Sequence, residues 1–423
     1  MRTIKLNLRE NHIVFSRLIT LATGFTLNLL TANLIIEWSG EKDYAIFALI
    51  ASFPALLTFI DFGMGNAAYN IAVELNSDNS TKDKRLLNNL SPIVLTSIFL
   101  TVAVLMLLFG IYALYPEYFR VTLLGQEAAW KSSVIAMIIV CLSTPLTIAY
   151  KVLLALGRNL QVIFLQAAIP FLTCLLALLG VQTNVKILIY LAFPISLLLL
   201  AIFAFKETNM LRNLQLRHTL TLVRKNARNL INHSLLSVTM MLLANLTSFL
   251  PRYILARESD HSQLVQLSFM LMYFSSAQSI IGSEGQAIST KIRSNKLGDD
   301  RDMIRKGIIR CLVIAVITSL GLLSLSLLNT ISPFTLITPQ QAIFTSIILC
   351  IWSLQVIPNF LNSQTKNIYF FIVVYLLALT YSLVAWNFLD TMNFTQIFWQ
   401  ILLPANVIIS FGVIAHFKFG IRH

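Results

Sequence analysis

Long apolar runs, separated by short polar stretches, recur along the whole chain. An apolar run of about 20 residues is long enough, as a helix, to cross the hydrocarbon core of a bilayer. The pattern therefore predicts a chain that is helical and crosses a membrane many times. We place twelve spans at 13–36, 44–72, 91–113, 132–156, 162–181, 187–205, 232–255, 264–287, 308–329, 341–363, 368–387 and 394–417.

The composition agrees with this pattern. Of the 423 residues, 57% are hydrophobic and only 12% are charged, and the mean hydropathy is +0.77. A soluble protein of this length needs far more polar surface to cover its core. We therefore predict an all-α membrane protein.

A basic segment, 206–231, divides the twelve predicted spans into two sets of six. The triplet Gly65–Asn66–Ala67, at the end of the second span, recurs as Gly285–Gln286–Ala287 at the same place in the second half. An even number of spans per half makes such repeats parallel, related by an axis along the membrane normal. We predict two pseudo-symmetric six-helix bundles, 1–205 and 232–423, around a central cavity.

The loop charges predict the orientation of the chain. Most of the 31 Lys and Arg residues fall in the two terminal segments and in the loops on the same side. Cytoplasmic loops are enriched in Lys and Arg, so we expect both termini in the cytoplasm. The formal net charge of +13 then reflects topology and attraction to anionic membrane lipids, and it does not indicate nucleic-acid binding.

The stretch "FIDFGMGNA" ends the second span on polar and small residues. Asp61 lies close to the predicted cytoplasmic surface, and Gly63 and Gly65 permit close approach of backbones. With Asn66, these residues form a candidate gate, and Asp61 and Glu284 are candidates for coupling to H⁺ or Na⁺. The alternative is a helix end whose polar residues meet water and headgroups.

Ionisable residues inside a membrane span are costly and often functional. Arg17 begins a polar stripe at helical spacing that continues through Thr20, Gly24, Asn28 and Thr31. A lipid-facing helix would not favour this stripe, so we expect it to face inward. Arg17 would then bind an anionic headgroup, because its planar guanidinium suits a diphosphate. The alternative is an Arg that snorkels to the interface.

Two further cations are candidates for the same role. Lys151 lies in the fourth span, one and two turns after Thr147 and Thr144. Arg252 ends the seventh span, on the same predicted face as Asn245. Each has an ordinary alternative, a snorkelling Lys and an interfacial Arg.

Taken together, "DFGMGNA" at the end of the second span, twelve spans and a basic mid-chain loop resemble the Wzx-type polysaccharide flippases. These belong to the multidrug/oligosaccharidyl-lipid/polysaccharide (MOP) exporter superfamily. The resemblance covers essentially the whole chain in topology, but only one short motif. It implies translocation of undecaprenyl-pyrophosphate-linked oligosaccharide units, such as O-antigen repeats, across the bacterial inner membrane by alternating access. It also implies a cationic lumen, ion coupling, and a polysaccharide polymerase and chain-length proteins as partners.

Two other functions remain open. A cation-coupled multidrug exporter would need a buried carboxylate for cationic drugs, and the sequence places none in the middle of a span. A polysaccharide polymerase or glycosyltransferase would need a longer loop with acidic residues than this chain offers. The scattered His and Cys residues predict no catalytic site, cofactor or metal site.

Overall fold

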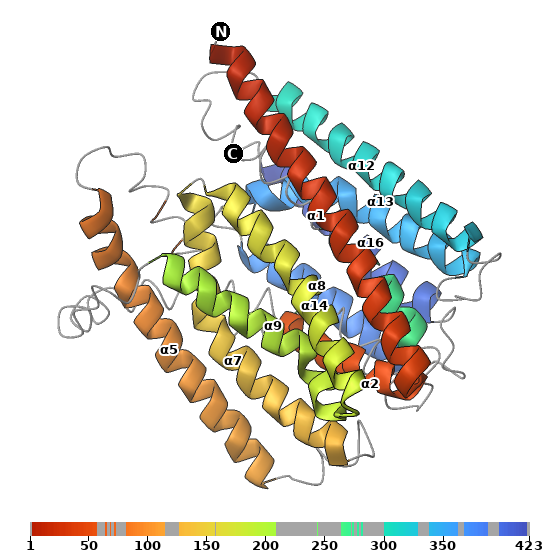
Figure 1. The fold of residues 1–423 in the computed structure, drawn as a ribbon. Helices are drawn as coiled ribbons and strands as arrows, with labels where there is room; N and C mark the ends of the chain where they lie inside the picture. Colours follow the sequence, from red (N-terminus) through yellow and green to blue (C-terminus); the bar gives the residue numbers. More distant parts are fainter. Residues whose placement is uncertain are drawn as a thin grey trace. The chain divides into compact units, whose positions relative to one another are not determined.

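The computed structural model describes most of the chain as α-helix (Figure 1). Described are residues 2–56, 64–65, 68, 72, 82–114, 127–156, 158–208, 243, 264–271, 273–274, 277–278, 281, 300–328, 338–362, 368–387 and 397–420. The chain divides into two compact units, Met1–Leu242 and Leu243–His423.

Seven helices are described in the N-terminal unit. They are α1 (Arg2–Ser39), α2 (Glu41–Ala51), α3 (Phe53–Leu56), α5 (Lys82–Leu114), α7 (Glu127–Ala155), α8 (Asn159–Gln182) and α9 (Lys186–Glu207). Helix α9 packs against α7, α8 and α2, while α1 packs along α8 and α5 along α7. Helix α9 ends two residues into the segment predicted as a linker, and the linker beyond Thr208 lies outside the described residues.

A tight turn joins α8 and α9 and sets the start of α9. Asn184 adopts a left-handed conformation with φ 54°. The N–H of Val185 donates to the carbonyl of Gly180 (2.9 Å), and the N–H of Asn184 donates to the carbonyl of Val181 (3.1 Å). This pair of bonds is the Schellman motif, which satisfies carbonyls at a helix end. A hypothetical Cβ on Gly180 would lie 2.9 Å from the backbone nitrogen of Ile189, so the absence of a side chain permits the close approach.

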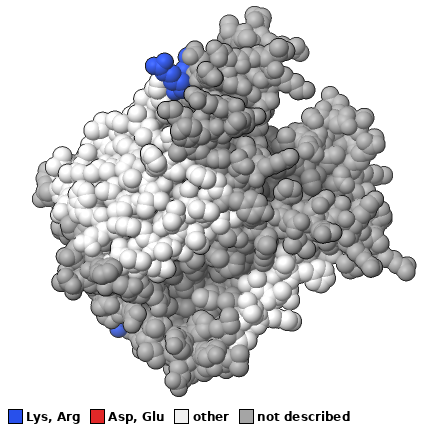
Figure 2. All heavy atoms as spheres, turned by 180° about the vertical axis from the view of Figure 1, so that it is seen from behind, with Lys and Arg blue, Asp and Glu red and all other residues white. Residues whose placement is uncertain are grey.

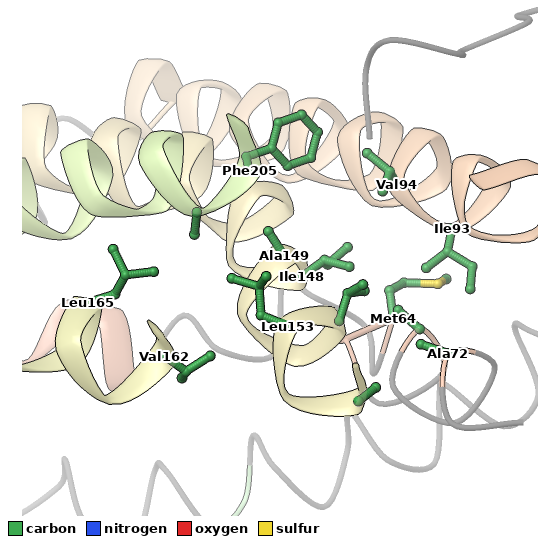
Figure 3. Packing of buried hydrophobic residues seen from close by; sticks show 14 of the residues in the cluster. Met64, Ala72, Ile93, Val94, Ile148, Ala149, Leu153, Val162, Leu165 and Phe205 are labelled. Carbon is green, nitrogen blue, oxygen red and sulfur yellow. The ribbon is translucent and has the colours of Figure 1, made fainter. Parts of the chain in front are cut away.

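The helices of the N-terminal unit run between two ends. At one end, α1 and α8 finish, and α2, α7 and α9 begin; we call it the Asp43 end. We call the opposite end the Arg158 end. A buried apolar cluster fills the Arg158 end (Figure 3) and joins the beginnings of α5 and α8 to the ends of α7 and α9. Met64, Ala68 and Ala72 belong to this cluster. Their spacing of four is that of one helical face, so this side of the predicted second span is core.

The C-terminal unit is also helical in its described part. Its described helices are α12 (Asp300–Leu328), α13 (Pro339–Asn362), α14 (Ile368–Asn387), the π-helical turn η2 (Phe398–Leu402) and α16 (Leu403–Gly420). Helix α13 packs against α12 and α16, and α14 packs against α16. Helical residues between 264 and 281 also join the unit, since Ile281 is buried in one cluster with Cys311 of α12 and Leu349 of α13.

The described helices agree with the expectation of a membrane protein. Four of them, Ala128–Leu153, Leu160–Gln182, Lys186–Glu207 and Ile304–Ser324, are long and apolar enough to cross a bilayer. Many large apolar side chains are exposed, including Phe164 and Phe411. Figure 2 shows one face whose described surface is almost entirely uncharged, with Lys or Arg only near its margins. Such a surface suits lipid contact. The full set of twelve spans in two bundles remains a prediction.

Candidate functional site

Lys151 is an exposed cation near the end of α7, between the buried residues Ala149 and Val152. The apolar residue Leu142 is also exposed and lies nine positions earlier. Nine residues correspond to about two and a half turns, so Lys151 points about half a turn away from Leu142. The exposed apolar side of α7 is therefore not the side that carries Lys151.

The two threonines before Lys151 are satisfied within their own helix. The hydroxyl of Thr144 donates to the carbonyl of Val140 (2.9 Å), and that of Thr147 donates to the carbonyl of Thr144 (2.7 Å). Such local bonds let a threonine lie in an apolar environment without a partner on another helix. Lys151 is thus the charged residue on this face of α7.

The polar stripe of α1 takes part in helix packing. A Cβ on Gly24 would lie 3.4 Å from Pro170 of α8, so the stripe touches α8 at this level. Thr31 is buried and donates to the carbonyl of Leu27 (2.8 Å), whereas Asn28 is half-buried. Arg17 lies within α1, but its side chain is outside the described part of the structure.

Most of the residues predicted for the gate, for ion coupling and for the second headgroup position fall outside the described part of the chain. Gly65 is buried and directly follows Met64, a member of the apolar cluster at the Arg158 end, as close packing of a small residue would require. The others lie outside the described residues; these are Asp61, Gly63, Asn66, Asn245, Arg252 and Glu284. The gate, the coupling residues and the second headgroup position therefore stay predictions.

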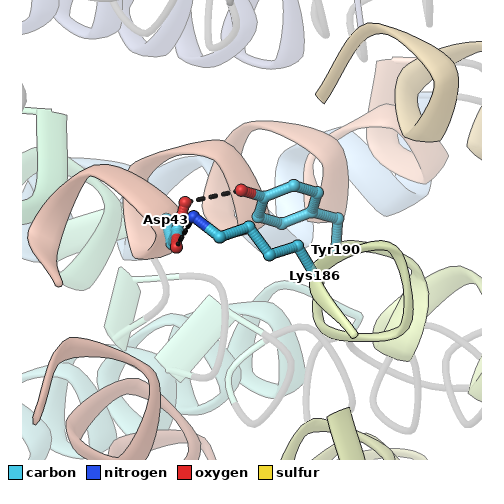
Figure 4. A network of polar contacts seen from close by, with 3 residues as sticks. All are labelled: Asp43, Lys186 and Tyr190. Carbon is cyan, nitrogen blue, oxygen red and sulfur yellow. Dashed lines mark hydrogen bonds and ion pairs between the residues drawn. The ribbon is translucent and has the colours of Figure 1, made fainter. Parts of the chain in front are cut away.

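A polar cluster that the sequence did not reveal lies at the Asp43 end (Figure 4). The hydroxyl of Tyr190 donates to Oδ1 of Asp43 (2.5 Å), and Nζ of Lys186 lies 2.9 Å from Oδ2. Oδ2 has no well-aligned hydrogen bond, so its contact with Lys186 is an ion pair. The Asp43 side chain is 3% exposed and that of Lys186 is 45% exposed. We call Asp43, Lys186 and Tyr190 the Asp43 cluster.

Local structure explains why these three side chains meet. Lys186 and Tyr190 lie one turn apart on α9, so both can reach the same group on α2. Asp43 lies in the first turn of α2, where the helix dipole favours a negative charge. In the sequence, Asp43 is an acid at the edge of a span beside Lys42, a pattern that is typical of a loop. The sequence alone did not indicate that Lys186 and Tyr190, near the start of another helix, would contact this acid.

The C-terminal unit has a neutral polar contact at the start of α13. The N–H of Thr338 donates to Oε1 of Gln341 (3.0 Å), and the N–H of Gln341 donates to Oγ1 of Thr338 (3.3 Å). This reciprocal pair is a capping box. Nε2 of Gln341 also donates to Oε1 of Gln266 (2.7 Å), which ties α13 to the helical residues after 264.

Among the described residues, no group of three or more His, Cys, Asp or Glu side chains could hold a metal ion. The cation on α7, the Asp43 cluster and the amide contact at Gln341 instead offer charges and hydrogen bonds. Their chemistry is that of charge recognition and hydrogen bonding.

No protein-family profile and no curated protein sequence matches this chain. Solved structures do resemble it. The eukaryotic MATE transporter AtDTX14 has a TM-score of 0.69 at 14% identity, covering 97% of this chain and 96% of that one. A point mutant of the Vibrio cholerae MATE transporter VcmN has a TM-score of 0.65 at 13% identity over 99% and 98% of the two chains.

The lipid II flippase MurJ, in an inward closed conformation, has a TM-score of 0.63 at 12% identity over 97% and 87% of the two chains. At these identities the similarity establishes the fold alone. The chain thus has the fold of these MATE transporters and of MurJ.

Proposed function

We propose that this chain is a Wzx-type flippase that moves undecaprenyl-pyrophosphate-linked oligosaccharide units from the cytoplasmic to the periplasmic leaflet by alternating access. The fold supports a transporter, since the chain resembles both a multidrug resistance MATE transporter and a lipid II flippase over nearly its whole length. The choice of an anionic, lipid-linked cargo rests on one observation, the exposed Lys151.

Lys151 supports this cargo through its position and its charge. A cation on an apolar helix is costly unless it meets an anion or water. Lys151 lies half a turn from the exposed apolar residue Leu142, which favours contact with a cargo path over contact with acyl chains. An ammonium group forms charge-assisted hydrogen bonds with phosphate oxygens, which are among the stronger hydrogen bonds in proteins.

The remaining parts of the proposal rest on the sequence. Arg17, Asn28, Asn245 and Arg252 would extend the headgroup path, with membrane lipids around the prenyl chain. Asp61, Gly63, Gly65, Asn66 and Glu284 would form the gate or couple transport to H⁺ or Na⁺. The chain would lie in the bacterial inner membrane with both termini in the cytoplasm, near a polysaccharide polymerase and chain-length proteins.

A multidrug exporter is the second candidate, because MATE transporters share the fold. A cationic drug would need a carboxylate that is accessible and not already neutralised. Among the described residues, the buried carboxylate of Asp43 is paired with Lys186, so it offers little attraction to a cation. The exposed Lys151 would repel such a drug. These observations favour the anionic cargo.

The test replaces Lys151 in a strain whose own gene has been deleted. We expect Lys151→Met to reduce export by about tenfold or more, since charge-assisted hydrogen bonds contribute about 1.5–3 kcal/mol. Lys151→Arg should retain part of the activity. Lys131→Met, which removes an exposed lysine from the other end of α7, is the matched control.

Surface polysaccharide and the leaflet position of the lipid-linked units are the readouts, with membrane protein levels measured in parallel. Normal export by Lys151→Met would remove the observation that carries the proposal. Normal surface polysaccharide in the deletion strain, together with loss of drug efflux, would favour the exporter instead.

A further inference from the structure

The two charges of the Asp43 cluster differ greatly in their access to solvent. Asp43 is buried, whereas almost half of the Lys186 side chain is exposed. The carboxylate therefore depends on its partners inside the protein. Lys186, in contrast, has a side chain that is 45% exposed, so its ammonium can turn to an anion arriving from outside.

The surroundings of the cluster favour a negative charge. Asp43 lies in the first turn of α2, and Lys186 is the first residue of α9. The residues before these helices, Gly40 and Val185, cap the helix starts without a side-chain hydrogen bond. Helix starts carry partial positive charge and unpaired N–H groups. The carboxylate thus lies in the first turn of one helix and contacts an ammonium at the start of another.

An external anion can take the place of the Asp43 carboxylate beside Lys186 only when Asp43 is uncharged. If Lys186 turned to an external anion while Asp43 stayed ionised, a buried charge would lose its counter-ion, which is strongly unfavourable. The obstacle disappears once Asp43 takes up a proton on Oδ2, the oxygen that has no well-aligned hydrogen bond. The proton and the anion then bind together, and each raises the affinity for the other.

We propose that Lys186, at the start of α9, is a binding residue for a phosphate group, and that Asp43 occupies this position as an internal counter-ion until it is protonated. The identity of the anion rests on the proposed function, in which the cargo carries a pyrophosphate. Lys186 would then receive one of its phosphates at the Asp43 end, the predicted periplasmic end, opposite to the end near Lys151.

Other charged groups near this end lie on the helices packed around the Asp43 cluster. They are Glu37 on α1, Glu41 and Lys42 on α2, and Glu127 and Lys131 on α7, while α8 carries no charged residue. Glu37, Glu41, Lys42 and Lys131 are exposed. Exposed charges interact weakly through water, so they change the field at Lys186 much less than the buried Asp43 does.

The experiment measures anion binding to the purified full chain in detergent, with inorganic sulfate as the probe. Sulfate has the shape of a phosphate group and keeps a constant charge between neutral and mildly acidic pH. At neutral pH, Asp43→Asn should bind sulfate about tenfold more tightly than the wild type, because one opposing charge is removed. The double variant Asp43→Asn with Lys186→Met should lose this gain.

The wild type provides a second measurement that needs no change at Asp43. Its affinity for sulfate should rise on acidification, whereas Lys186→Met should show a much smaller rise. Lys186→Arg, which keeps the charge, should retain the rise. Equal affinities of wild type and Asp43→Asn at neutral pH, or an unchanged acid-dependent rise in Lys186→Met, would overturn the inference.

The sulfate-binding test of Lys186 and the export test of Lys151 can succeed or fail independently. Lys151→Met should leave the Lys186-dependent part of sulfate binding unchanged, because Lys151 lies at the other end of α7. A Lys186-dependent site in a chain whose Lys151→Met variant exports normally would support the anion site and reject the proposed cargo. Loss of export in Lys151→Met without any Lys186-dependent sulfate binding would support the proposed cargo and reject the anion site.

Discussion

Replacing Gly180 by alanine should separate α8 from α9 at the tight turn before Lys186. The added Cβ would lie 2.8 Å from Cγ1 and 2.9 Å from the backbone nitrogen of Ile189. A backbone atom cannot rotate away, so the two helices must move apart. Overpacking of this kind costs about 1–3 kcal/mol, while alanine in place of a helical glycine gains up to about 1 kcal/mol. The net effect should be a loss of about 1 kcal/mol.

Gly110 in α5 is the matched control, because a Cβ there would meet nothing within 4 Å. Gly110→Ala should therefore show only the gain in helix propensity. Thermal unfolding of both variants in detergent measures the difference. For domains of similar size, about 1 kcal/mol shifts Tm by about 2–4 °C. Equal Tm values for Gly180→Ala and Gly110→Ala would refute the close approach of α8 and α9.

Three other substitutions test separate contacts by the same thermal unfolding assay. Tyr190→Phe should lower stability by about 1.5–3 kcal/mol, because it removes a hydrogen bond to a buried carboxylate; an unchanged Tm would speak against that bond. Thr338→Ala should cost about 1 kcal/mol by removing half of the capping box, and Thr338→Ser should restore most of it. Gly412→Ala should destabilise α16 against α14, since its Cβ would lie 2.6 Å from Cγ2 of Val374. Adding Val374→Ala should then recover part of the loss, and failure of this double variant to improve on Gly412→Ala would contradict the contact.

Much of the helical architecture follows from neighbours along the chain. Each of the long described helices overlaps a predicted apolar span, because about twenty successive apolar residues favour a helix in lipid whatever the rest of the chain does. The capping box at Thr338 and Gln341 involves residues three apart, so its motif is also local. The same holds for the left-handed turn at Asn184, a residue type that tolerates this conformation.

The candidate sites depend on packing between distant segments. Asp43 and Tyr190 are 147 residues apart, and an acid at a span edge gives no sign that a lysine and a tyrosine on another helix will enclose it. In the same way, Gly24 meets Pro170 only because α1 packs along α8. Charge and polarity are properties of single residues and can be recognised along the chain. Whether a charge is buried, paired or exposed depends on which helix faces meet, and hydrophobic periodicity leaves that choice open, since lipid and protein interior are both apolar.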